Sequence, residues 1–250
     1  MNIGYSMPSA FPLYPEPPVF YENNNMINIL FRTSTEVLRE LVPSPLLPNP
    51  DNLAFIYVGD LGIVAPQKLR YKEAGLGIPV TFKGRPGNYY VSLYLDAVAG
   101  IVGGREIWGW PKKDAEITYV VDQMMVQVSV SRDGVALITA SVNATEQVKP
   151  IPIEPEIPSF NLKIVPSVKK GHAPDVLQLT SVLTATKKKE LSRGSATLSF
   201  KSAPFDQLGK ISILEIIGGT QSVEDLNLGY GETLFDYLTE TQEQRVNEKA

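Results

Sequence analysis

Residues 116–130 read Glu116-Ile117-Thr118-Tyr119-Val120-Val121-Asp122-Gln123-Met124-Met125-Val126-Gln127-Val128-Ser129-Val130. The stretch is rich in β-branched residues on both sides of a polar centre, which is typical of two paired strands. It therefore predicts a β-hairpin that turns at Asp122-Gln123. A second turn is expected at Arg132-Asp133-Gly134, leading into a further strand over 135–142.

Similar strand-like segments recur through the rest of the chain, bounded by turn residues. They cover 26–31, 88–95, 160–165, 176–184, 196–200 and 211–219. One short helix is expected over 33–42, where Thr33 or Ser34 can cap it and Pro43 ends it. Many strands and little helix predict a mostly β (α+β) fold, an antiparallel sheet or barrel with a few short helices.

The 250 residues are expected to form a single domain over 1–250. Residues 1–22 contain five prolines, which disfavour regular helix and central strand, so an extended arm is expected there. The arm would lie on the domain or on a partner subunit, and we expect a homo-oligomer. Residues 147–158 form a second proline-rich connection, and 187–190 are expected to be a solvated loop or strand end.

Composition excludes several kinds of site. The chain has no cysteine and one histidine, so disulfides, cysteine nucleophiles and zinc sites built on several histidines are ruled out. A net charge of −4 argues against nucleic acid as a partner. The N-terminus lacks a signal-peptide pattern, and apolar runs are too short for a membrane helix. We therefore expect a cytoplasmic protein with no membrane or nucleic-acid partner and no metal.

The chemistry is concentrated in residues 103–113, Gly-Gly-Arg-Glu-Ile-Trp-Gly-Trp-Pro-Lys-Lys. A lysine in water is almost fully protonated at neutral pH. Burial among Ile, Trp and Pro side chains disfavours the ammonium form, and a second cation nearby disfavours it further. A neutral amine is a nucleophile toward ketones, so this segment predicts a lysine that forms a Schiff base.

Residues 104–113, GREIWGWPKK, resemble the active-site stretch of the acetoacetate decarboxylase family. In the family's order, similar stretches also occur at 28–33, 37–46, 73–82 and 235–238. By this resemblance Lys112 matches the Schiff-base lysine, Lys113 its cationic neighbour and Glu73 an active-site glutamate. That family is the standard example of a lysine activated by desolvation or by a neighbouring cation. The resemblance implies a cone-like β-barrel with Lys112 inside it, and an enzyme that needs no cofactor.

Two positions depart from the family pattern. The decarboxylases carry an arginine shortly before the first strand, where this chain has Asn23-Asn24-Asn25. They also carry a second glutamate, at a position that aligns with Ile56. The departures leave Lys112 intact but bear on how a substrate carboxylate is held and on whether decarboxylation is the reaction.

Three further residues are candidates for substrate contact. Arg32 could bind a carboxylate, because a guanidinium matches two carboxylate oxygens. Trp108 could form an apolar wall, and Tyr230 could bring a hydroxyl to the pocket. For each of them a packing or surface role is the alternative.

The two adjacent lysines are expected to act differently. If Lys112 and Lys113 lie on one strand, their side chains leave opposite faces. Burial of Lys112 would then matter more for its reactivity than the charge of Lys113.

Three functions follow from these observations. The leading one is a carbon–carbon lyase that converts a small β-keto acid, acetoacetate, to acetone and CO2 through an imine on Lys112. The second is the same imine used for aldol condensation and dehydration of a pyruvate-like keto acid. The third is a non-catalytic β-barrel that binds a small acid, against which an intact Lys112 argues.

Overall fold

Strands dominate the computed structural model, which describes residues 4–151 and 157–239. The strands are β1 (Val19–Arg32), β2 (Leu47–Pro48), β3 (Leu53–Ala65), β4 (Leu69–Phe82), β5 (Arg85–Leu95), β6 (Lys112–Asp114), β7 (Glu116–Asp122), β8 (Met125–Arg132), β9 (Val135–Gln147), β10 (Ser159–Val165), β11 (Val176–Phe200) and β12 (Glu215–Asp236). The helical elements are α1 (Thr35–Leu41), α2 (Val98–Gly103), the π-helical η1 (Gly104–Trp108) and the 3-10 turn η2 (Leu208–Lys210). The mostly β fold with a few short helices is confirmed.

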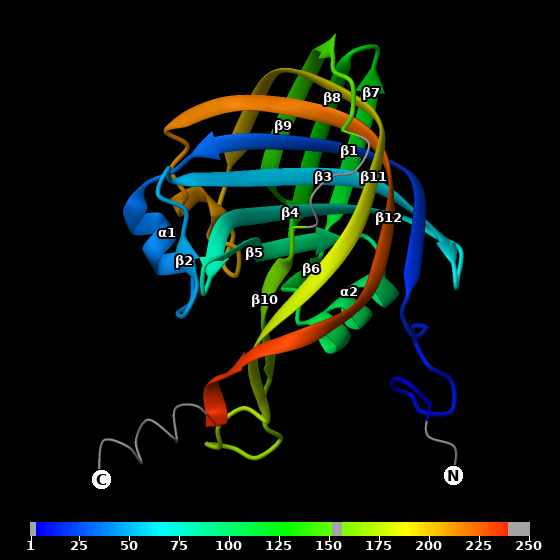
Figure 1. The fold of residues 1–250 in the computed structure, drawn as a ribbon, viewed down its shortest axis with the longest axis vertical. Helices are drawn as coiled ribbons and strands as arrows, with labels where there is room; N and C mark the ends of the chain where they lie inside the picture. The colour runs from blue at the N-terminus through cyan, green and yellow to red at the C-terminus, as the bar shows by residue number, and fades with distance from the viewer. Residues whose placement is uncertain (1–3, 152–156, 240–250) are drawn as a thin grey trace.

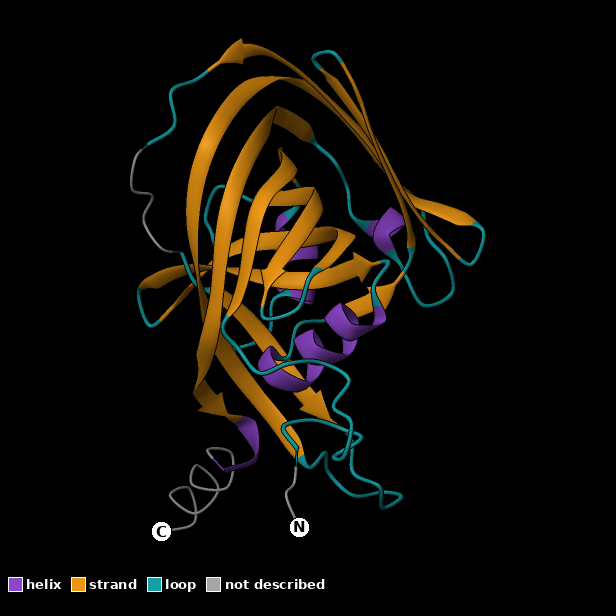
Figure 2. Ribbon diagram, turned by 90° about the vertical axis from the view of Figure 1, so that its right-hand side faces the viewer, coloured by secondary structure: helices purple, strands orange, loops and turns teal. Residues whose placement is uncertain are grey.

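The strands form one sheet in the order β10-β5-β4-β3-β1-β12-β11-β9-β8-β7. Because β10 pairs with β5 on one side and with β11 on the other, this part of the sheet closes into a ring. The long strands β11 and β12 bend around the molecule to complete it (Figure 1). In the perpendicular view, helical segments lie beside the curved strands (Figure 2). Ring closure gives the sheet an inner face, on which a site can be built.

Alternation along the strands separates two apolar clusters. On β1, Ile27 and Ile29 belong to a large core shared with β8 and β9. Their neighbour Met26 belongs to a second cluster that contains Trp108 and Leu93. The second cluster lies around the lysine segment, and its apolar side chains keep water away from that segment.

Local signals in the sequence predicted most of the short elements correctly. Ser34 caps α1, with its side chain accepting a hydrogen bond from the Val37 amide at 3.2 Å. The first hairpin turns one residue later than expected, because Asp122 pairs with Met125 and Gln123 adopts a left-handed φ of 54°. The following turn at Asp133-Gly134 is confirmed.

Two expectations about irregular segments need correction. The arm becomes strand at Val19, because residues 19–32 pair with both β3 and β12. Residues 187–190 lie inside β11, a strand of 25 residues, and not in a loop or at a strand end. The long strand β12 supplies hydrogen-bond partners there, with Lys187 opposite Asp225 and Lys188 opposite Glu224, which outweighs the weak strand preference of lysine. Residues 1–3 of the arm and 152–156 of the second proline-rich connection lie outside the described residues.

No helix within residues 4–151 and 157–239 combines the length and the apolar character needed to cross a bilayer.

Candidate active site

A tight change of chain direction delivers Lys112. The chain runs through α2 and η1 and ends this helical passage at Gly109, whose φ of 76° is left-handed. A side chain there would also meet the backbone of Lys163, with a Cβ only 2.7 Å from its Cα, so glycine is required. The next residues lead into β6, which pairs in parallel with β5 and sets Lys112 opposite Leu93.

Lys112 is buried beside a buried carboxylate. Its exposed fraction is 4%, that of Glu73 is 7%, and Lys112 Nζ lies 3.0 Å from Glu73 Oε2. The ammonium also lies over the Trp110 ring, 4.7 Å from the centroid. Gly104 makes room for the lysine, because a Cβ there would lie 2.5 Å from Lys112 Cδ. The amine is therefore held in a defined position, next to a group that can exchange a proton with it.

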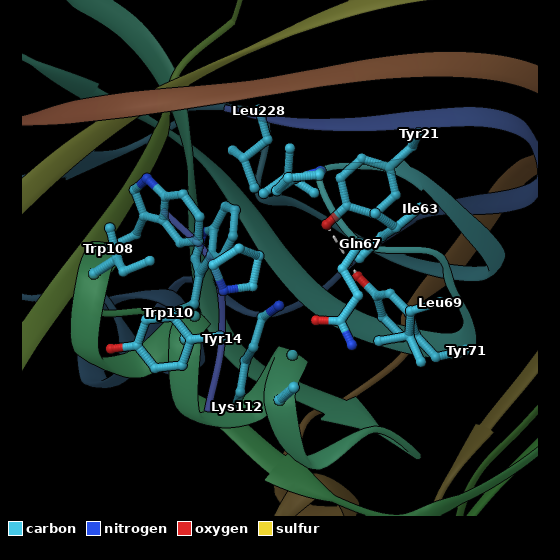
Figure 3. Close-up of a pocket in the computed structure, with 18 residues that line it drawn as sticks. Tyr14, Tyr21, Ile63, Gln67, Leu69, Tyr71, Trp108, Trp110, Lys112 and Leu228 are labelled. Carbon is cyan, nitrogen blue, oxygen red and sulfur yellow. Dashed lines mark hydrogen bonds between the residues drawn. The ribbon is translucent and has the colours of Figure 1, made fainter. Parts of the chain in front are cut away.

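Tyrosine hydroxyls surround Glu73. Tyr57 donates a hydrogen bond to Glu73 Oε1. The hydroxyls of Tyr21 and Tyr71 lie 3.2 Å apart. Figure 3 draws these two side chains in the same pocket as Lys112. Burial, with a further contribution from the negative charge of Glu73, raises the pKa of Tyr57 well above its usual value. Burial likewise raises the pKa of Tyr90 to about 12. These phenols stay neutral at physiological pH and can act as donors.

Lys112 borders two cavities. The smaller, of about 60 Å³, is lined mainly by apolar and aromatic residues that include Tyr14, Trp108 and Leu228 (Figure 3). The larger, of about 310 Å³, contains Glu73 and lies along the inner faces of several strands. The amine therefore stands where an apolar space and a more polar one meet.

Lys113 points the other way, as the strand geometry predicts. Its Nζ lies 2.7 Å from Asp206 Oδ1 and 2.7 Å from the Phe205 carbonyl oxygen. Asp206 also accepts hydrogen bonds from Tyr94 at 2.7 Å and Arg132 at 2.8 Å. Burial acts to raise the pKa of Asp206, but these hydrogen bonds outweigh it and lower the pKa. The charge of Lys113 is thus balanced on the far side of β6.

Of the three residues expected to contact the substrate, only Trp108 lines a cavity that borders Lys112. Trp108 lines the smaller cavity, with its indole N–H donating to the Gly229 carbonyl oxygen at 3.0 Å. Arg32 lines neither cavity that borders Lys112; its Nε lies 2.9 Å from Glu215 Oε2. Tyr230 is 55% exposed and donates to Glu16. Neither Arg32, at the end of β1, nor the exposed Tyr230, within β12, is among the described residues that line a cavity bordering Lys112.

The structure also shows where the two positions that depart from the family pattern lie. Ile56 is fully buried in the large core, and it is its neighbour Tyr57 that lines the cavity. Asn24 is fully buried and joins strands, donating to the Glu224 carbonyl oxygen at 2.8 Å and accepting from the Gly62 amide at 2.9 Å. Neither side chain is among those that line the two cavities.

Sequence reasoning missed several residues of the site. Tyr57, Lys188 and Glu224 all line the larger cavity. Glu73 of β4 faces Gly59 of β3, and Tyr57 lies two residues from Gly59 on the same face, so the two-residue repeat of these consecutive strands could have suggested the contact. No local signal distinguishes Lys188 from the two lysines that flank it.

Comparison with known proteins agrees with this site. A family-wide sequence profile described as acetoacetate decarboxylase (ADC) matches residues 2–238. An acetoacetate decarboxylase of Ralstonia nicotianae is 31% identical over 240 residues, covering 94% of this chain and 95% of its own. The chain belongs to the acetoacetate decarboxylase family. It is therefore a member of a family of carbon–carbon lyases.

Solved structures share the fold of this acetoacetate decarboxylase family member. The crystal structure of the acetoacetate decarboxylase of Legionella pneumophila has a TM-score of 0.84 at 25% identity, covering 95% of this chain and 96% of that one. The enduracididine biosynthesis enzyme MppR, solved with the condensation product of pyruvate and imidazole 4-carboxaldehyde, has a TM-score of 0.82 at 19% identity. It covers 95% of this chain and 98% of its own, and it shows the fold alone.

Proposed function

We propose that this protein is a cofactor-free Schiff-base decarboxylase of β-keto acids, which converts acetoacetate to acetone and CO2. One observation carries the proposal. The buried amine of Lys112 lies 3.0 Å from the buried carboxylate of Glu73, at the edge of a cavity of about 310 Å³. An amine attacks a ketone in its neutral form, and Glu73 is placed to accept the proton that Lys112 must lose.

The reaction begins with proton transfer and addition. Glu73 accepts a proton from the Lys112 ammonium, and the free amine attacks the ketone carbon. The resulting carbinolamine loses its hydroxyl as water, with the proton supplied by Glu73 acid, and becomes an iminium. Tyr57 holds Glu73 by its hydrogen bond and so fixes the direction in which the carboxylate exchanges protons.

The iminium then draws the electron pair of the breaking bond. The bond between the carboxylate carbon and its neighbour breaks, its electrons move to the nitrogen, and CO2 leaves. The enamine takes a proton on the carbon that carried the carboxylate, and water hydrolyses the resulting imine to acetone and the lysine amine. The positive nitrogen stabilises the charge that develops in this step. The apolar walls at Trp108 suit a carboxylate that must lose its hydration before it departs.

Trapping with borohydride tests the imine directly. Acetoacetate followed by borohydride should add a reduced adduct to Lys112, located by peptide mapping, and should inactivate the enzyme. Lys112→Ala should take up none, and Lys113→Met should be labelled as the wild type is. Labelling at another lysine, or none with any keto acid, would reject the mechanism.

A second candidate uses the same imine for aldol condensation and dehydration. The larger cavity has room for a second reactant, and MppR, which shares the fold, was solved with a condensation product. Pyruvate plus an aldehyde would then give an ultraviolet-absorbing enone and no gas. CO2 and acetone from acetoacetate, well above the spontaneous rate, would favour decarboxylation.

We also propose that the chain acts as one domain in a cytoplasmic homo-oligomer. Support comes from the arm, where Met7 is 71% exposed and Phe11 82% exposed, and from Val98 at 67%. Apolar side chains this exposed are favourable to bury between subunits. Light scattering on the purified protein measures the mass, and a monomer would contradict the proposal.

A further inference from the structure

The larger cavity contains a second charged residue pair, at a distance from Lys112. Lys188 of β11 and Glu224 of β12 both line it and are direct partners in the antiparallel register. Directly opposed residues have Cβ atoms roughly 5 Å apart on the same face of the sheet. The inner face therefore holds a cation and an anion side by side.

The local structure fixes this pair in place. Glu224 is 7% exposed, and Ser222 donates a hydrogen bond to its Oε2 at 3.2 Å. Its carbonyl oxygen accepts from the buried Asn24 at 2.8 Å. The next lysine along β11, Lys189, lies on the outside with Nζ 2.7 Å from Asp225 Oδ1. Alternation along the two strands thus turns one lysine inward and its neighbour outward.

Among the described residues that line this cavity, Lys112 and Lys188 are the two cations. Lys112 is the proposed nucleophile and cannot also serve as the anion receptor. Arg32 and Lys113 are held elsewhere by Glu215 and Asp206. A lysine ammonium has three donors, so Lys188 can bond a neighbouring group and a ligand oxygen together.

The pair is set apart from Lys112 along β12. Leu228 and Lys112 both line the two cavities, and Glu224 is four residues from Leu228 along β12, which is roughly 13 Å of strand at 3.3 Å per residue. A cation at the departing carboxylate would also stabilise the ground state more than the transition state, in which that charge moves away. Lys188 therefore suits a different anionic group of the substrate.

The volume agrees with a longer substrate. A cavity of about 310 Å³ lies at the lower end of the range of roughly 300–1,000 Å³ found for drug-sized ligands. Acetoacetate has seven non-hydrogen atoms and leaves much of that space unfilled. A chain extending from the ketone away from the departing carboxylate would fill it and reach the charged pair.

We propose that Lys188 is a specificity-determining residue that binds a second carboxylate, so that 3-oxo dicarboxylic acids are preferred over acetoacetate. This rests on the proposed imine at Lys112. With 3-oxoadipate, Lys112 attacks carbon 3, the bond between carbons 1 and 2 breaks, and its electrons move to the iminium nitrogen. Carbon 1 leaves as CO2, carbon 2 takes a proton, and hydrolysis releases 4-oxopentanoate. The far carboxylate stays on Lys188 throughout.

Two substrates of equal chain length test this. Wild type should have a higher kcat/KM for 3-oxoadipate than for 3-oxohexanoate, which lacks the second carboxylate. Lys188→Met should lower kcat/KM for 3-oxoadipate at least about tenfold, through KM, because a hydrogen bond between charged groups is lost. It should change kcat/KM for 3-oxohexanoate less than about twofold. Lys187→Met, an exposed neighbour, is the matched control and should change neither.

Equal losses on both substrates, or no preference in the wild type, would overturn the proposal. The anion site is tested independently of the chemistry by calorimetric binding of adipate. Adipate has no ketone and cannot form an imine with Lys112. Binding by wild type that Lys188→Arg keeps and Lys188→Met loses supports the site even if no keto acid is decarboxylated. Absence of adipate binding in folded wild type, checked by circular dichroism, rejects it.

Discussion

Lys113 Nζ lies 2.7 Å from Asp206 Oδ1, on the face of β6 that Lys112 does not occupy. The neighbouring cation is therefore part of a structural network with Tyr94 and Arg132, and its charge is balanced by a carboxylate that is 4% exposed. The groups in contact with the Lys112 amine are Glu73 and the Trp110 ring, and Lys113 is not one of them.

Lys113→Met should consequently affect stability more than chemistry. We expect normal borohydride labelling of Lys112 and a modest loss of kcat. The bond to Asp206 is lost, so the thermal midpoint should fall. A shift of several units in the acidic limb of the pH–rate profile, without loss of stability, would show that Lys113 acts on the amine directly.

Acid unfolding should report the same network. The pKa of Asp206 is lowered from 3.8, so its stabilisation is present above the unfolded value and is lost as the pH falls through the folded value. Lys113→Met removes one of the hydrogen bonds that lower this pKa. Its acid-unfolding midpoint, followed by circular dichroism, should therefore lie at higher pH than that of wild type. An unchanged midpoint would contradict the coupling.

Glu73→Gln should abolish most activity while leaving the fold intact. The amide cannot accept a proton from Lys112, and loss of a general acid–base typically costs roughly 10²–10⁴ in rate. Tyr57→Phe should cost less, because it removes only the hydrogen bond that positions Glu73. Steady-state kinetics and borohydride labelling measure both. Wild-type rates in Glu73→Gln would remove the carboxylate from the mechanism.

Gly104→Ala should separate reactivity from stability. The new Cβ would lie 2.5 Å from Cδ and 2.7 Å from Cε of Lys112, so the flexible lysine must move away from its position. We expect a thermal midpoint close to wild type and a large drop in labelling by acetoacetate. Gly229→Ala is the control, since a Cβ there meets nothing within 4 Å, and it should keep full labelling. Normal labelling in Gly104→Ala would mean that the lysine position is not critical.

The buried phenols should limit stability in base. Burial raises the pKa of Tyr90 from 10.0 to about 12, and it also raises the pKa of Tyr57 well above its usual value. A group whose pKa is raised on folding stabilises the protein below its unfolded pKa, and this contribution is lost as the pH rises through the folded value. Stability should thus fall between about pH 10 and 12, and ultraviolet titration should show these phenols ionising only with unfolding. Tyr57→Phe should make the fall shallower, and early ionisation in the native state would contradict the burial.

Much of the fold followed from local patterns. The hairpins around 116–142, the Ser34 cap and the mostly β character follow from periodicity and turn residues, which act over a few positions. The choice of Lys112 followed from its apolar neighbours and the family resemblance. The opposite direction of Lys113 followed from the two-residue repeat of a strand.

Which strand face turns toward the cavity was decided only by the tertiary structure. Alternation defines two sets of side chains on each strand, but both look alike until β10 joins β5 to β11 and closes the ring. Closure brings Tyr57 to Glu73, turns Lys188 inward, and leaves Arg32 outside. Contacts between residues far apart in the chain carry no local signal, and so the sequence and its resemblance predicted Lys112 and Glu73 but not Tyr57, Lys188 or Glu224 in the same cavity.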